Sequence, residues 1–160
     1  MKQEILDLYD DNGNSLNKTI IRRVDEIPDG ANIMASYILI KNNKKYLLEQ
    51  ATEKNNFRWA IPGGHKLSGE TIEYGLEREL KEELGIINME YKKIDTIKFP
   101  LGKYIFNIFF SEDAINLNIL QFQEDEVIQV KWFTKEEILK LIEEEKIARG
   151  YAFILNKYMD

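Results

Sequence analysis

Three glutamates near the middle of the chain have the spacing of a metal-binding cluster. Glu79, Glu82 and Glu83 stand at positions i, i+3 and i+4, so a helix through them would carry all three carboxylates on one face. Like charges at this spacing repel one another and destabilise a plain surface helix by about 0.2–0.5 kcal/mol per pair. A hard cation such as Mg²⁺, which prefers carboxylate and carbonyl oxygens, would remove that repulsion. The spacing therefore predicts a metal site built from carboxylates.

The residues around this cluster predict a glycine-containing loop that leads into a helix. Pro62–Gly64 interrupts regular structure, and Ser68 or Gly69 can cap a helix over residues 70–84. Gly85 is the residue type that most readily ends a helix in the left-handed conformation. Apolar residues four apart would hold this helix on the core beside its acidic face: Ile72, Leu76, Leu80 and Leu84.

The same segment matches the pattern of the Nudix box. Gly64 is followed after five residues by Glu70, and the run at residues 78–86 begins after seven more. Agreement at fixed spacing over so many positions is far more specific than a short glycine motif. The chain therefore resembles the Nudix hydrolases, and residues 59–63 look like the usual lead-in to their box. The matching positions are Gly64, Glu70, Arg78, Glu79, Leu80, Glu82, Glu83, Gly85 and Ile86.

The Nudix resemblance implies a metal-dependent hydrolase of pyrophosphate bonds, MutT-like in its machinery, with Mg²⁺ or Mn²⁺ as cofactor. The metal donors that it implies are Glu79, Glu82, Glu83, the backbone carbonyl of Gly64 and, as an indirect ligand, Glu70. Arg78 would either pair with Glu82 at i+4 or, as in relatives, orient a carboxylate. The alternative for the acids is a solvated helix face, which the glycine loop and fixed spacing argue against.

Hydrolysis also needs a base that takes a proton from water, and several acids compete for this role. In Nudix relatives the base is in some cases a box glutamate and in others an acid on a later loop. Glu82 or Glu83 therefore competes with Glu124 and Glu126, which precede the last predicted strand. Glu83 and Glu126 are the leading candidates. The alternative for residues 124–126 is a polar turn that leads into the strand.

Residues on both sides of the glycine loop are candidates for contact with the substrate. The guanidinium of Arg58 could bind a phosphate, and His65 could donate a hydrogen bond to one. Glu124 completes the predicted substrate contacts. The alternative for His65 is an incidental loop histidine, and Trp59 is expected to pack beneath the glycine loop.

Composition limits the chemistry that the rest of the chain can supply. The 160 residues contain no cysteine and one histidine, which removes disulfides, thiolate nucleophiles, zinc–thiolate sites and multi-histidine metal centres. The net charge of −6 argues against binding of long nucleic acid, although a small polyphosphate can bind through divalent cations. No stretch has the character of a signal segment or a membrane span, so a cytoplasmic location is expected by default.

The order of the predicted elements fits one domain over residues 1–160, with residues 1–30 as an N-terminal hairpin extension packed on it. Strands are predicted at 31–40, 46–48, 89–98, 103–110 and 127–133, and C-terminal helices at 134–145 and 148–158. Residues 112–126 are expected to form an irregular link. This α/β order is consistent with what the resemblance implies: a Nudix-type α/β/α sandwich with a mixed β-sheet and additional C-terminal helices.

The N-terminal residues resemble the branch of the Nudix superfamily related to isopentenyl diphosphate isomerase. That isomerase pairs a cysteine with a glutamate and holds its metal through several histidines, so isomerase activity is disfavoured here. The predicted substrate is instead a nucleoside diphosphate linked to another moiety, or a similar small diphosphate. The alternative function is a non-catalytic nucleotide sensor. Exposed aromatic residues near Tyr104 and Phe106 would permit a homodimer.

Overall fold

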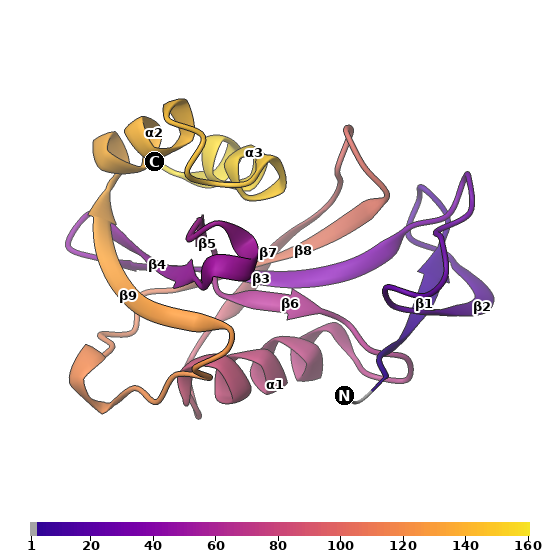
Figure 1. Cartoon of the computed structure of the whole chain (residues 1–160), viewed down its shortest axis with the longest axis horizontal. Coiled ribbons are helices and arrows are strands. Elements are labelled where there is room, and N and C mark those ends of the chain that lie inside the picture. The colour runs from indigo at the N-terminus through magenta and orange to yellow at the C-terminus, as the bar shows by residue number, and fades with distance from the viewer. Residues whose placement is uncertain (1–2) are drawn as a thin grey trace.

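The computed structural model describes residues 3–160, and within them the strands form two sheets (Figure 1). The smaller sheet is a hairpin of β1 (Ile5–Tyr9) and β2 (Ser15–Ile21). The larger sheet contains β3 (Ile33–Asn42), β4 (Lys45–Ala51), β5 (Trp59–Ala60), β6 (Gly63–His65), β7 (Lys92–Lys98), β8 (Tyr104–Ser111) and β9 (Val127–Thr134). The helices are α1 (Ile72–Leu84), α2 (Lys135–Glu143) and α3 (Arg149–Tyr158), with short 3₁₀ helices η1 (Glu53–Asn55) and η2 (Leu117–Ile119).

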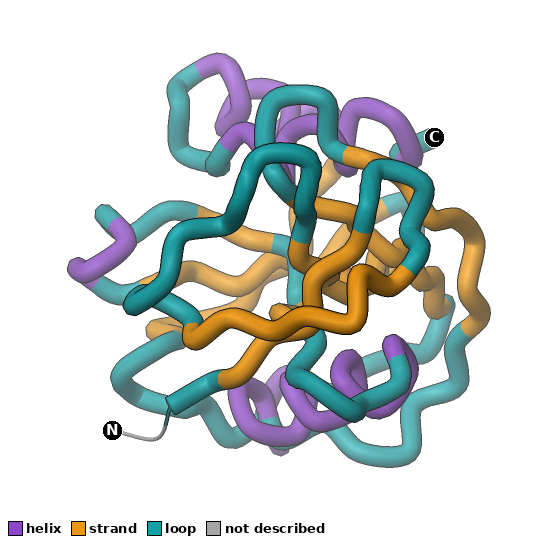
Figure 2. The backbone as a smooth tube through the Cα atoms, turned by 90° about the vertical axis from the view of Figure 1, so that its right-hand side faces the viewer, coloured by secondary structure: helices purple, strands orange, loops and turns teal. Residues whose placement is uncertain are grey.

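The larger sheet is mixed and is built around β3. This strand pairs in parallel with β8, from Ile33 opposite Tyr104 to Ile40 opposite Ser111, and antiparallel with β6. At its end β3 turns into β4, which pairs with β9 and β5. Helix α1 covers one face of the sheet, while α2 and α3 cover the other (Figures 1 and 2). The chain thus has the predicted α/β/α sandwich with a mixed sheet.

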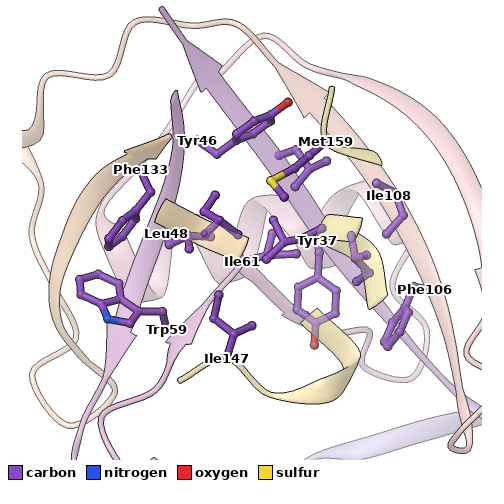
Figure 3. Close-up of a cluster of buried hydrophobic side chains, with 14 of the residues drawn as sticks. Tyr37, Tyr46, Leu48, Trp59, Ile61, Phe106, Ile108, Phe133, Ile147 and Met159 are labelled. Carbon is purple, nitrogen blue, oxygen red and sulfur yellow. The ribbon is translucent and has the colours of Figure 1, made fainter. Parts of the chain in front are cut away.

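Each face of the large sheet carries its own apolar cluster, which explains why residues 33–40 of β3 are buried without alternation. On one face, the predicted stripe of α1 packs on the sheet through Leu76, Leu80 and Leu84 with Ile38, Ile40 and Leu47. On the other face, α2 and α3 contribute Ile138, Ile154 and Leu155 to a cluster with Tyr37, Leu48 and Trp59 (Figure 3).

Asp7 on β1 fastens the hairpin to the loop between β6 and α1. Its carboxylate accepts hydrogen bonds from the Ser68 hydroxyl at 2.7 Å, from Lys66 Nζ at 3.0 Å and from the Gly69 amide at 3.2 Å. Partial burial raises the pKa of Asp7, but these three donors outweigh it and hold the pKa below its ordinary value. The Lys66 side chain is itself only 9% exposed, so solvent screens this ion pair weakly.

Asp7→Asn is expected to lower the free energy of unfolding at neutral pH by about 2 kcal/mol, because Lys66 would lose its buried counter-charge. Since the folded-state pKa of Asp7 is lowered, its contribution exists above the unfolded pKa and is lost as pH falls through the folded pKa. Urea titrations should therefore show a difference in the free energy of unfolding between wild type and Asp7→Asn that is smaller near pH 3 than at neutral pH. Asp29→Asn, at a fully exposed carboxylate, is the control, and equal losses in both variants would contradict the assignment.

Two predictions about the loop before α1 were wrong. Gly63–His65 is not an interruption but the strand β6, which pairs with Ala35–Tyr37 of β3. Helix α1 begins at Ile72 rather than at residue 70, and Thr71 caps it by accepting a hydrogen bond from the Tyr74 amide. The helix cannot extend further back because Thr71 has an extended backbone, with a φ of −79° and a ψ of 163°. The predicted left-handed C-cap at Gly85 is confirmed.

Phe106 of β8 is buried and cannot contribute to a dimer interface, whereas Tyr104 is partly exposed. Phe106 is 4% exposed and packs in the cluster beneath α3, and the Tyr104 ring stacks on it at 5.7 Å. The prediction of exposed side chains was wrong for Phe106, because its side chain packs in the cluster covered by α3. Elsewhere, the predicted capping box of Thr134 and Glu137 is present at the start of α2. In residues 3–160 no helix is both long and apolar enough to span a bilayer.

Candidate functional site

A cavity of about 610 Å³ lies beside the C-terminal half of α1. Helix α1 forms one wall with its acidic face, and β4 and the strands β5 and β6 form the floor. The loop after β2 and the segment Lys54–Arg58 supply basic residues, and the start of α3 closes a further side. Segments that are far apart in the sequence therefore meet at one site.

Arg78 organises the acids on the α1 wall. Its guanidinium donates to Glu79 at 2.8 Å, to Glu82 at 3.3 Å and to the backbone carbonyl of His65 at 3.0 Å. Both predicted arrangements of Arg78 are thus present, the i+4 pair with Glu82 and the contact that orients a second carboxylate. Glu82 is 55% exposed at the rim, whereas Glu79 is 12% exposed and lies deeper.

Glu70 lies outside the cavity lining, behind Arg78. Its Oε2 accepts from Arg78 Nε at 2.6 Å, and its Oε1 accepts from Arg78 Nη2 at 3.1 Å and from the Leu67 amide at 2.8 Å. Such a two-pronged pair fixes the plane of the guanidinium, so Glu70 is placed to act through Arg78.

Glu70→Gln is expected to lower kcat about 10- to 100-fold with a small change in KM, because a neutral amide would no longer fix the Arg78 guanidinium. Steady-state kinetics on a diphosphate that the wild-type chain cleaves would measure this change. Glu73→Gln, at an exposed position on the outer face of α1, is the matched control. Wild-type kcat in Glu70→Gln would contradict a positioning role.

The backbone at Gly64 lies unusually close to the acidic face of α1. A Cβ atom on Gly64 would stand 2.5 Å from the Cδ of Glu79, so a larger residue would push this carboxylate away. The absence of a side chain brings the backbone of β6 next to the carboxylates. Gly64 therefore lies next to Glu79, one of the predicted carboxylate donors, and metal binding by the Gly64 carbonyl stays a prediction.

Glu49 on β4 is a cavity residue that the sequence analysis missed. It is 6% exposed, lines the cavity and brings its carboxylate close to that of Glu83. One signal in the sequence could have identified it, since Glu49 directly follows the apolar run 46–48 and stands two positions after Leu47, on the same face of the strand.

Burial and mutual repulsion raise the pKa of the acids in the cavity. Burial is the main cause that raises the pKa of Glu83, and the facing charge of Glu49 adds to it. Burial likewise raises the pKa of Glu49, and of Glu79 despite the opposing effect of Arg78. A divalent cation would favour the ionised forms, so cation binding to these acids would release protons.

Basic side chains also line the cavity. Arg22, Arg23 and Arg58 all reach it, and the first of them also binds Glu4 at 2.6 Å. Burial, followed by the charges of Arg22, Arg23 and Arg78, lowers the pKa of His65 to about 3, so the imidazole is neutral at physiological pH. His65 is therefore a hydrogen-bonding group in this cavity rather than a cation.

The structure brings most of the predicted site residues together. The cavity is lined by Gly64, Arg58, His65, Arg78, Glu79, Glu82, Glu83 and Glu126. Glu126 receives an ion pair from Lys54 at 2.6 Å, which links residues 112–126 to the segment after β4. Two predicted site residues, Glu70 and Glu124, lie outside the cavity lining, and Glu124 is exposed to solvent. Trp59 is buried, as expected, with its ring against Phe133 at 4.7 Å.

The donor types of the cavity fit Mg²⁺ or Mn²⁺, which bind oxygen ligands. In residues 3–160, however, no three acidic or histidine side chains already converge as in a formed metal site. Arg78 accounts for this arrangement, because it draws Glu79 and Glu82 toward its guanidinium. The fit therefore rests on the carboxylates and on the close approach of the Gly64 backbone.

Comparison with known proteins identifies relatives over most of the chain. A family model described as NUDIX domain matches residues 32–153. An uncharacterized Nudix hydrolase of Listeria innocua is 30% identical over 139 residues, which cover 82% of this chain and 80% of that protein. A nucleoside triphosphatase, NudI, of an Enterobacter species is 28% identical over 113 residues, which cover 62% of this chain and 80% of that protein.

The fold is shared with solved structures at low sequence identity. The Deinococcus radiodurans protein DR0079 superposes with a TM-score of 0.80 over 96% of this chain and 98% of its own, at 17% identity. Because the overlap covers nearly all of both chains, the arrangement of strands and helices around the cavity is common to the two proteins.

Proposed function

The chain belongs to the Nudix family, and from that membership we propose that it is a metal-dependent hydrolase of a pyrophosphate bond. The proposed substrate is a nucleoside diphosphate linked to another moiety, or a similar small diphosphate. The proposed cofactor is Mg²⁺ or Mn²⁺, held by Glu79, Glu82 and Glu83 with the carbonyl of Gly64.

One observation carries this proposal: the α1 acids and the guanidinium groups of Arg22, Arg23 and Arg58 line the same cavity. A diphosphate carries negative charge, so the α1 acids alone would repel it. Cations held by these acids would reverse the sign of the field, and Arg22, Arg23 and Arg58 would attract the phosphates directly. The nucleoside triphosphatase among the relatives supports a nucleotide as one half of the substrate.

The proposed mechanism divides the work among named side chains. Bound Mg²⁺ or Mn²⁺ would polarise the phosphorus, stabilise the leaving phosphate and make water easier to deprotonate. Arg58 and Arg23 would hold the phosphates, and His65, being neutral, would donate one hydrogen bond. Glu83 and Glu126, which line the cavity, are the two candidates to accept the proton from water.

A substrate panel tests the proposed function. Purified protein with Mg²⁺ or Mn²⁺ would be incubated with nucleoside diphosphate sugars, ADP-ribose, dinucleoside polyphosphates and nucleoside di- and triphosphates. Released phosphate and nucleoside monophosphate would then be identified by chromatography. Cleavage of a pyrophosphate bond that stops on addition of a chelator is the expected result.

The panel also separates the enzyme from a nucleotide sensor. A protein that binds one compound of the panel in the presence of the metal but releases no product would be a sensor, and the hydrolase proposal would fail. Cleavage that continues at full rate in excess chelator would instead contradict the metal dependence.

A further inference from the structure

Glu49 is the cavity acid whose surroundings are hardest to explain by protein contacts alone. The residue is 6% exposed, and its Oε1 atom meets no hydrogen-bond donor in the part of the chain that the structure describes. Buried carboxylate oxygens in native proteins almost always have a partner, because desolvation without one is costly. Among the described residues, the one neighbouring group that can donate to Glu49 is a protonated Glu83 carboxyl, and when both acids are ionised they need a partner that is not a protein side chain.

The position of Glu49 follows from strand geometry. Leu47 lies two residues earlier, on the same face of β4, and packs in the cluster that contains Leu80 of α1. The next residue on this face is Glu49, which meets the acidic part of α1 in place of its apolar stripe. On either side of β4, Ala60 of β5 and Val130 of β9 stand opposite Glu49. Backbone pairing on both edges thus holds this carboxylate in place.

The charges that face Glu49 are also acidic. Glu83 lies against it, and Glu79 and Glu126 are close enough to act on its charge. Lys54, a cation that lines the same cavity, forms its ion pair with Glu126. An oxygen without a donor that sits among further carboxylates is the setting in which a hard divalent cation binds.

We propose that Glu49 is an additional ligand of the divalent cation, so that the sheet and α1 both hold the metal. This inference rests on the proposed function, because it takes the acids of α1 as the other ligands. It adds to the Nudix box a carboxylate from β4, which the spacing of the box does not include.

Calorimetric titration of the purified chain with Mn²⁺ alone tests this role without any substrate. Glu49→Gln is expected to weaken Mn²⁺ binding at least about tenfold, because the amide keeps the shape of the side chain but loses its charge. Glu49→Asp, which keeps the charge but withdraws the oxygens, should also bind Mn²⁺ more weakly than wild type. Glu136→Gln, at an exposed position on α2, is the matched control and should bind as wild type does.

Melting temperatures give a second measurement that separates ligation from a structural role. Without metal, Glu49→Gln should melt at the wild-type temperature or above it, because one of two adjacent buried acids has been neutralised. With Mn²⁺, its rise in melting temperature should be smaller than that of wild type. A lower melting temperature without metal, together with wild-type Mn²⁺ affinity, would show a structural role and overturn the proposal.

The remaining outcomes distinguish this proposal from the proposed function. Wild-type Mn²⁺ affinity in Glu49→Gln, in a chain that still hydrolyses diphosphates, would overturn only the role of Glu49. Weak binding in Glu49→Gln with wild-type binding in Glu49→Asp would show that charge suffices, and would overturn direct ligation. If the wild-type chain binds Mn²⁺ but cleaves no compound, the hydrolase proposal fails. The role of Glu49 as a metal ligand can still be tested by Mn²⁺ titration.

Discussion

Glu83→Gln is expected to lower kcat at least about 1,000-fold on whichever diphosphate the wild-type chain cleaves. Glu83 lies on the α1 wall of the cavity next to Glu79 and faces Glu49, so it can serve as a metal ligand or as the base. Either role requires a charged carboxylate, which glutamine lacks. The measurement is kcat at saturating Mg²⁺ or Mn²⁺, with circular dichroism to show that the variant is folded.

Two further variants make this result specific. Glu77→Gln changes an exposed acid on the same helix and should leave kcat within about twofold of wild type. Glu126→Gln tests the other candidate base. The residue that acts as the base is the one whose substitution still lowers kcat when the metal is saturating. A Glu83→Gln variant that retains more than a tenth of wild-type kcat would sink both proposed roles of Glu83.

Gly63→Ala is expected to lower the free energy of unfolding by about 4 kcal/mol, a large fraction of the stability of an ordinary domain. The residue has a φ of 138°, and a Cβ atom there would stand 2.0 Å from the carbonyl oxygen of Ser36. The contact is backbone of the neighbouring strand β3, which cannot move aside. Urea titration followed by tryptophan fluorescence would measure the loss.

Gly69→Ala is the matched control for this substitution. Gly69 also has a positive φ, of 82°, but a Cβ atom there would have no neighbour within 4 Å. Its loss should be about 1 kcal/mol, which is the cost of the backbone conformation alone. Equal losses at the two glycines would show that the close approach of β6 to β3 contributes nothing.

The elements with a clear hydrophobic period could be predicted from sequence. The apolar stripe of α1, its end at Gly85 and the capping box of Thr134 all depend on residues close together in the chain, and the structure has them. The strand β6 could not be predicted, because Gly63 and Gly64 carry no side-chain pattern. Only its pairing with β3, almost thirty residues away, makes it a strand.

The same distinction holds for the candidate site. The spacing of Glu79, Glu82 and Glu83 on one helix was readable, because helix geometry alone puts them on one face. The run before Glu49 marks it as an acid on a buried face, but its meeting with the α1 acids depends on the packing of β4 against α1, which lies outside any local pattern. The Nudix resemblance was confirmed, while its isomerase-like branch and the roles assigned to single residues stay predictions.

The hairpin of β1 and β2 brings Arg22 and Arg23 to the cavity from outside residues 32–153, the part that the family model matches. Two of the groups proposed to bind the phosphates, Arg22 and Arg23, thus lie in a different part of the chain from the acids proposed to hold the metal, whereas Arg58 and His65 lie in the same part. The family match over residues 32–153 includes the acids but does not include Arg22 and Arg23. Two chains that agree over that range can therefore differ in substrate through the N-terminal hairpin alone.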